Sequence, residues 1–111
     1  MMNSTVSFDE FQKLDIRIGT IVSVEHVAGS EKLLKLAVDI GESAPRQIIA
    51  GIAAFVEPEA LVGGQCPFIA NLEPRMIRGL ESQGMLLAID AGGGFALLHP
   101  SRAVPAGSRA R

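Results

Sequence analysis

The chain has 111 residues, which is enough for one domain with a single, modest hydrophobic core. Hydrophobic residues make up 48% and charged residues 20%, a composition that excludes a disordered tail. The formal net charge of -2 provides no overall attraction to nucleic acid, although a local group of cations on an acidic protein still creates a positive field.

The single cysteine, Cys66, excludes an internal disulfide, and its apolar neighbours predict a buried thiol. No cysteines and histidines have the spacing of a zinc site, so we expect neither metal nor cofactor. The N-terminus lacks the basic and apolar regions of a signal peptide, and the longest apolar stretch, residues 48–56, is too short to span a bilayer. We therefore expect a soluble cytoplasmic protein with no membrane partner.

A helical turn and a long strand are predicted first along the chain. Ser7 and Glu10 have the spacing of a capping box, which predicts a helical turn over residues 8–13. Apolar side chains at alternate positions then predict a strand over residues 15–24, bent at Gly19. These alternating residues are Ile16, Ile18, Val22 and Val24.

Turn signals separate the remaining elements. Further strands are predicted over residues 33–40, 46–52, 65–71, 84–90 and 95–98. Pro58 and the following residues to Val62 predict a short helix, and Pro67 predicts that its part of the fourth strand lies at a sheet edge or strand start. This order, with small extensions at both ends, predicts an all-β OB-fold, a five-stranded Greek-key barrel with one short helix, as a single domain over residues 1–111.

A polar run between the last two core strands carries candidate binding groups. Arg75 and Arg78 are three residues apart, so in a helical or turn conformation they would project to one side and suit phosphate oxygens. Alternatively, they are solvated or pair with Glu73 and Glu81. The same run supplies Asn71, Ser82 and Gln83, which suit sugar hydroxyls and base edges, and Met85, which suits an apolar contact. Structural roles remain open for two of them: Asn71 as a cap of the turn at Pro74, and Met85 as a core residue at a strand start.

A hydrolase is the catalytic alternative, because Ser82, Asp90 and His99 occur in the order nucleophile, acid, histidine. The sequence around Ser82 misses the G-x-S-x-G elbow by one residue, and the chain is too short for the large sheet that this elbow requires. With His26 as the only other histidine, the sequence favours a protein that is not an enzyme.

Aromatic content indicates what kind of RNA would bind. Proteins that bind single strands stack bases on aromatic rings. This chain has five Phe, several of them expected to be buried, and no Trp or Tyr. We therefore expect recognition of a folded RNA through its shape, phosphates and 2′-hydroxyls.

Four motifs, in order, resemble the structure-specific tRNA-binding domain family. They are Asp15-Ile-Arg-Ile-Gly19, Gly29-Ser-Glu-Lys-Leu-Leu-Lys-Leu36, Ala50-Gly-Ile52, and Asn71-Leu-Glu-Pro-Arg-Met-Ile-Arg-Gly79 with Glu81-Ser-Gln-Gly-Met85. The resemblance runs from about residue 8 to the C-terminus. The family includes the domain appended to bacterial methionyl-tRNA synthetases and its free-standing form, the synthetase beta subunit.

The resemblance implies a non-catalytic OB-fold homodimer that binds the outside corner of tRNA by shape and assists a methionyl-tRNA synthetase in trans. It places RNA contacts on Lys32, Asn71, Arg75, Arg78, Ser82, Gln83 and Met85. The chain departs from many relatives at Val27 and at Cys66-Pro67, and it carries fewer cations than several of them. Apolar residues in excess of one small core predict that residues 8–13 and 95–111 form a twofold interface.

Two alternatives remain open. A second branch of the family consists of export-related chaperones that bind unfolded peptides in a dimer groove; these resemble the first strand of this chain but lack its run from Ser82 to Met85. The other alternative is a partner that docks on a synthetase without touching RNA.

Overall fold

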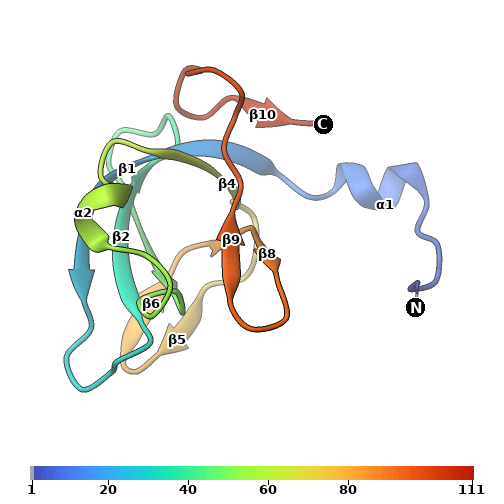
Figure 1. Ribbon diagram of the computed structural model, residues 1–111. Helices are drawn as coiled ribbons and strands as arrows, with labels where there is room; N and C mark the ends of the chain where they lie inside the picture. The colour runs from blue at the N-terminus through green and yellow to red at the C-terminus, as the bar shows by residue number, and fades with distance from the viewer. Residues whose placement is uncertain (1) are drawn as a thin grey trace.

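An antiparallel sheet with the strand order β3-β2-β1-β4-β7 forms the body of the protein (Figure 1). The computed structural model describes residues 2–111. Its elements are α1 (Phe8–Gln12), β1 (Ile16–His26), β2 (Leu34–Asp39), β3 (Arg46–Ala50), α2 (Pro58–Leu61), β4 (Gln65–Ile69), β5 (Arg75–Ile77), β6 (Leu80–Ser82), β7 (Met85–Leu86), β8 (Ala88–Asp90), β9 (Phe95–Leu97) and β10 (Arg109–Ala110). The sheet curls until β3 contacts β6 and β7, which nearly closes the barrel. The predicted all-β OB-fold is confirmed.

α1 begins at the predicted capping box. The Ser7 hydroxyl accepts a hydrogen bond from the Glu10 amide, and the Glu10 carboxylate accepts one from the Ser7 amide, both at 3.1 Å. None of the residues of α1 is buried. The helix stands away from the barrel, at the right of Figure 1, and its apolar residues Phe8 and Phe11 are exposed.

β1 contains a bulge that its sequence pattern did not reveal. The register with β2 shifts between Ile21 and Ser23, so that Val22 has no partner and is 49% exposed. The alternation that grouped Val22 with core residues therefore fails at this position. Gly19 lies where the strand crosses the core closely: a Cβ there would lie 2.8 Å from Cδ1 of Phe68. Glycine is required by this close approach.

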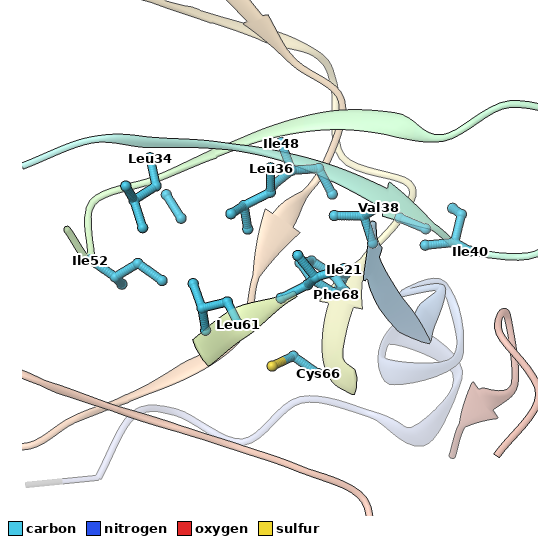
Figure 2. Close-up of a cluster of buried hydrophobic side chains, with 12 residues drawn as sticks. Ile21, Leu34, Leu36, Val38, Ile40, Ile48, Ile52, Leu61, Cys66 and Phe68 are labelled. Atoms are coloured by element: carbon cyan, nitrogen blue, oxygen red, sulfur yellow. The ribbon is translucent and has the colours of Figure 1, made fainter. Parts of the chain in front are cut away.

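The core fills the barrel between β1, β2, β3, β4 and α2 (Figure 2). Its fully buried side chains include Ile21, Leu34, Leu36, Val38, Ile48 and Phe68. Cys66 lies in the same cluster, as predicted, and burial raises the pKa of its thiol. The thiol is therefore uncharged at neutral pH.

Pro67 lies on an edge of the main sheet, as predicted. β4 pairs with β1 over its whole length, whereas β7 pairs only with Phe68 and Ile69. Opposite Pro67, the amide and carbonyl of Ile18 bond instead to Ser108 and Gly107. Because Ile18 directs its backbone groups away from β4, the missing N–H of proline removes no bond to β1.

The strand predicted over residues 84–90 is two strands, because the chain changes partner at Leu87. β7 pairs with β4, whereas β8 pairs with β9 in a separate hairpin. Leu87 donates its amide to the carbonyl of Pro67 at 3.0 Å, at the end of the main sheet. The β9 strand confirms the element predicted after the glycine-rich turn.

Candidate nucleic-acid interface

The β5–β6 hairpin carries both arginines of the polar run. Arg75 begins β5, and Arg78 and Gly79 form the turn with φ angles of 52° and 78°. Two successive positive φ angles make a tight two-residue turn that matches the twist of paired strands. The spacing of the arginines suggested a helical or turn conformation for both; Arg78 lies in a turn, but Arg75 to Ile77 pair as a strand.

The hairpin turn contacts the β1–β2 loop, which carries Lys32. Arg78 Nη1 donates to the Gly29 carbonyl at 3.2 Å. The carbonyl of Lys32 accepts a hydrogen bond from the amide of Ala53 at 3.0 Å. This bond joins the β3–α2 loop to the β1–β2 loop. In Figure 1 the β1–β2 loop and the β5–β6 hairpin lie along the lower edge, away from α1 and β10. Lys32, Arg75 and Arg78 are thus mounted at one end of the barrel.

Lys32, Arg75 and Arg78, here called the loop-end cations, are exposed. Within residues 2–111, none of them has a carboxylate oxygen within 4.0 Å, so the pairs with Glu73 and Glu81 are not formed. The paired cations lie elsewhere: Arg17 and Arg109 with Asp15, Lys35 with Glu25, and Arg46 with Glu42. The loop end therefore presents positive charge that no ion pair neutralises, on a chain whose net charge is -2.

Ser82 and Gln83 hold the hairpin to β3. Ser82 is 2% exposed, and its hydroxyl accepts from the Ile49 amide and donates to the Gly84 carbonyl, both at 3.0 Å. Gln83 Oε1 accepts a hydrogen bond from the backbone amide of Gln47 at 2.9 Å. The backbone amide of Gln83 donates to the backbone carbonyl of Gln47 at 2.8 Å. Both side chains act on the fold, and the Ser82 hydroxyl has no surface from which to reach a ligand.

Asn71 joins the end of β4 to the start of β1. Its Oδ1 accepts from the Asp15 amide at 2.8 Å, and its Nδ2 donates to the Lys13 carbonyl at 2.6 Å. The turn-capping role that the sequence left open is replaced by this long-range bond. Asn71 therefore positions the polar run that follows it.

Arg46 is a structural residue that the sequence did not single out. Its Nη1 donates to the carbonyls of Ala70 and Gln83, the latter at 3.0 Å. Its Nε and Nη2 donate to the two carboxylate oxygens of Glu42 at 2.9 and 2.8 Å, and these hydrogen bonds raise the pKa of the guanidinium. Only its position at the start of a strand after Pro45 was visible in the sequence.

Met85 is half-buried and, with Arg75 and Phe95, lines a hollow of about 190 Å³. Phe95 packs edge to face against Phe55, with ring centroids 5.7 Å apart. Neither ring belongs to the predicted site.

The expectation that several phenylalanines are buried is wrong, because Phe68 is the only buried one in residues 2–111. For Phe95, a usable signal was the run of small residues from Ala91 to Gly94 that precedes it.

The hydrolase residues are not assembled. The Ser82 hydroxyl is occupied by backbone partners, and His99 Nδ1 lies 2.8 Å from the Gln65 carbonyl and 3.8 Å from Cys66 Sγ. Across residues 2–111, no three His, Cys, Asp or Glu side chains are grouped closely enough to hold a metal ion. Over the same residues, every helix is too short or too polar to cross a membrane.

An OB barrel with unpaired cations on a loop and a hairpin at one end has the architecture of an oligonucleotide-binding module. Comparison with known families is more specific. The chain belongs to the tRNA-binding domain family: the family model described as "Putative tRNA binding domain" matches residues 16–109. The predicted family membership is confirmed.

Relatives in this family include parts of much longer enzymes. The chain is 55% identical over 102 residues to methionine–tRNA ligase of Methanothrix thermoacetophila and 47% identical over 108 residues to that of Cytophaga hutchinsonii. These matches cover 92% and 96% of this chain but only 15% and 16% of the ligases. The chain thus spans a small part of the length of these relatives.

Solved structures with the same fold include two differently named groups. A MetRS-related protein from Pyrococcus horikoshii is 35% identical, with a TM-score of 0.91 over 98% of this chain and 100% of that chain. The chaperone CsaA from Bacillus anthracis is 29% identical, with a TM-score of 0.87 over 97% of this chain and 100% of that chain. The fold alone therefore does not separate the RNA-binding and chaperone hypotheses.

Proposed function

We propose that this chain is a non-catalytic module that binds tRNA by its folded shape, at the outside corner, and acts in the cytoplasm. The observation that carries the proposal is the group of three exposed cations without carboxylate partners, on the β1–β2 loop and the β5–β6 hairpin. Guanidinium groups suit phosphate oxygens, and most contacts to folded RNA are to phosphates and 2′-hydroxyls.

Within this proposal the predicted contact residues have two roles. Lys32, Arg75, Arg78 and Met85 have the exposure needed to touch RNA. Asn71 and Ser82 position the loops, because the polar atoms of their side chains are engaged with backbone groups, and Gln83 does so through its Oε1. The proposal also includes assistance to a methionyl-tRNA synthetase in trans. The MetRS-related protein of P. horikoshii supports this part, because this chain matches it over its whole length.

Binding of three probes at one salt concentration tests the proposal: a folded tRNA, the same tRNA after denaturation, and an unfolded peptide. We expect a gel shift with the folded tRNA at the lowest protein concentration. Equal affinity for folded and denatured tRNA would show that shape is not recognised. Preferential capture of the peptide would favour the second candidate function, a peptide-binding chaperone, which the likeness to CsaA supports.

We further propose a twofold homodimer formed through α1 and the C-terminal residues 109–111. The rings of Phe8 and Phe11 lie 6.4 Å apart and, with Leu14, line a hollow of about 220 Å³ beside these residues. The interface is narrower than the predicted span 95–111, because Leu97 packs against the core and Phe95 against Phe55. A self-complementary apolar patch of this kind is typical of twofold dimers.

Sedimentation equilibrium at micromolar protein tests the dimer. We expect about twice the chain mass of 11.7 kDa for the unaltered protein. Replacing Phe8 and Phe11 together by aspartate should give the monomer mass, whereas Val62→Asp, at another exposed apolar position, should leave the dimer intact. A monomeric unaltered protein would contradict the dimer, and a dimeric double variant would contradict this interface.

A further inference from the structure

The hollow beside Arg75 has the size of a site for one small ring system. Its volume of about 190 Å³ is below the range of about 300–1,000 Å³ that is typical of pockets for drug-sized ligands. Its walls come from the end of β3, from β5 and β7, and from the β8–β9 hairpin. Gly51 contributes no side chain to it, and a Cβ built there meets only Leu33, at 4.0 Å. The space is therefore open on that side.

An aromatic pair flanks the hollow. Phe95 is 45% exposed and Phe55 is 46% exposed, with their ring planes at 75° to one another. Gly94 makes this arrangement possible, because a Cβ at that position would lie 2.7 Å from Cε1 of Phe55. The pair fixes the position of the Phe95 ring while leaving almost half of its surface uncovered.

A cation and an apolar group complete the site. Arg75 contributes a guanidinium that has no carboxylate partner in residues 2–111, and Met85 contributes a polarisable thioether. This combination of a half-exposed aromatic ring, apolar lining residues and an unpaired cation is complementary to a nucleotide, which has a planar base and an adjacent phosphate.

We infer that the hollow receives a single unstacked nucleobase of a folded RNA, stacked against Phe95, while Arg75 contacts the neighbouring phosphate. The inference rests on the proposed function and adds a base contact to recognition by shape. It also revises the expectation drawn from aromatic content, since one exposed ring is sufficient for one base. Unpaired loop and bulge bases of folded RNA are available for such contacts.

Substitution of Phe95 separates base capture from phosphate binding. Phe95→Ala should weaken binding of folded tRNA by about 5- to 150-fold, the effect typical of removing one base-stacking ring. Binding of a fully paired RNA duplex should not change, because it offers no unstacked base. The slope of log K against log salt should also stay the same, because the variant keeps every cation that binds phosphate.

The matched control is Ile89→Ala on the neighbouring strand. Ile89 is 46% exposed but pairs with Ala96, so it faces the side of the β8–β9 hairpin opposite to Ala88 and Phe95. Ile89→Ala should leave the affinities for folded tRNA and for the RNA duplex unchanged. Phe95→Leu, which keeps apolar bulk without an aromatic ring, should behave like Phe95→Ala in binding while preserving the thermal midpoint of unfolding.

Methyl NMR with adenosine monophosphate gives a direct readout of occupancy. A base in the hollow should shift the Met85 methyl signal by its ring current, whereas the exposed Met76 on the hairpin should not respond. Equal responses, or no response from Met85, would overturn the assignment. So would a Phe95→Ala variant with full tRNA affinity, or one that loses tRNA and duplex binding equally.

Two further outcomes separate this inference from the function on which it rests. If the unaltered protein binds neither RNA, the proposed function itself is wrong. If Phe95→Ala reduces affinity for an unfolded peptide and leaves that for tRNA unchanged, the hollow holds an aromatic side chain of a peptide, and the base assignment is overturned.

Discussion

Two polar regions of the molecule differ in where the hydrogen bonds of their side chains end. The first, here called the polar junction, consists of Asp15, Arg46, Asn71, Ser82 and Gln83, and its groups bond to backbone and to one another within the chain. The second consists of the loop-end cations, whose only side-chain bond among residues 2–111 is from Arg78 to Gly29.

This difference separates residues that hold the fold from residues that remain available to a ligand. A buried polar group that loses its partner costs stability, whereas a solvated cation can exchange water for a phosphate. Substitutions in the polar junction should therefore change stability, and substitutions at the loop end should change binding.

The largest effect should follow from Arg46→Ala. Two backbone carbonyls would lose a charged donor, so the free energy of unfolding should fall by about 2–4 kcal/mol, measured by urea denaturation. Arg46→Lys retains the charge but not the planar fork, so it should recover only part of this loss. If Arg46→Ala were as stable as the unaltered protein, the hydrogen bonds of Arg46 would contribute nothing to stability.

Ser82→Ala should have the next largest effect. The Ile49 amide would lose its acceptor at a buried position, which costs about 1–3 kcal/mol of unfolding free energy. Ser23→Ala, at an exposed position of β1, is the control and should change stability by less than about 0.5 kcal/mol. Equal effects of the two substitutions would mean that burial of the Ser82 hydroxyl is unimportant.

Alanine at both Arg75 and Arg78 should leave stability almost unchanged and weaken tRNA binding. The slope of log K against log salt should become shallower by about 0.9 for each phosphate that the variant no longer neutralises. Arg102→Ala removes another exposed arginine, on the segment between β9 and β10, and should not change the slope. If the double variant keeps both affinity and slope, phosphate binding at the loop end is excluded.

The smallest effect concerns pH. The hydrogen bond from Arg17, with the charges of Arg17 and Arg109, lowers the pKa of Asp15 below its ordinary value. A carboxyl group with a lowered pKa stabilises the folded state above its unfolded pKa of about 3.9, and this contribution disappears as pH falls through the folded value. Asp15→Asn should therefore flatten the decrease in the urea midpoint below about pH 4. If the decrease in the urea midpoint below about pH 4 were the same in Asp15→Asn, Asp15 would contribute nothing to the pH dependence of stability.

The sequence was sufficient to predict the elements that depend on residues close together in the chain. The capping box at Ser7, most long strands and the helix at Pro58 follow from short-range patterns, and the structure agrees with them. The errors lie where pairing overrides pattern. Val22 is displaced by a bulge in β1, and the strand predicted over residues 84–90 divides where its pairing changes from β4 to β9.

The candidate site was predictable in its charges but not in its division of roles. Arg75 and Arg78 are exposed, as binding arginines must be. The partners of Asn71 and Ser82, however, lie 56 and 33 residues away in the sequence, so no spacing could reveal that these side chains are engaged. Their contacts with RNA and those of the exposed residues stay predictions until binding is measured.

The backbone of Arg78 implies a trade-off between stability and ligand affinity. Its φ angle of 52° lies in the left-handed region, where a non-glycine residue carries a cost of about 1–2 kcal/mol. Asparagine or glycine would fit the first position of this turn better and should raise the thermal midpoint of unfolding of the protein. Either residue would also delete a positive charge from the tip. A more heat-resistant version of this protein is therefore easy to design at Arg78, and we expect it to hold RNA less tightly.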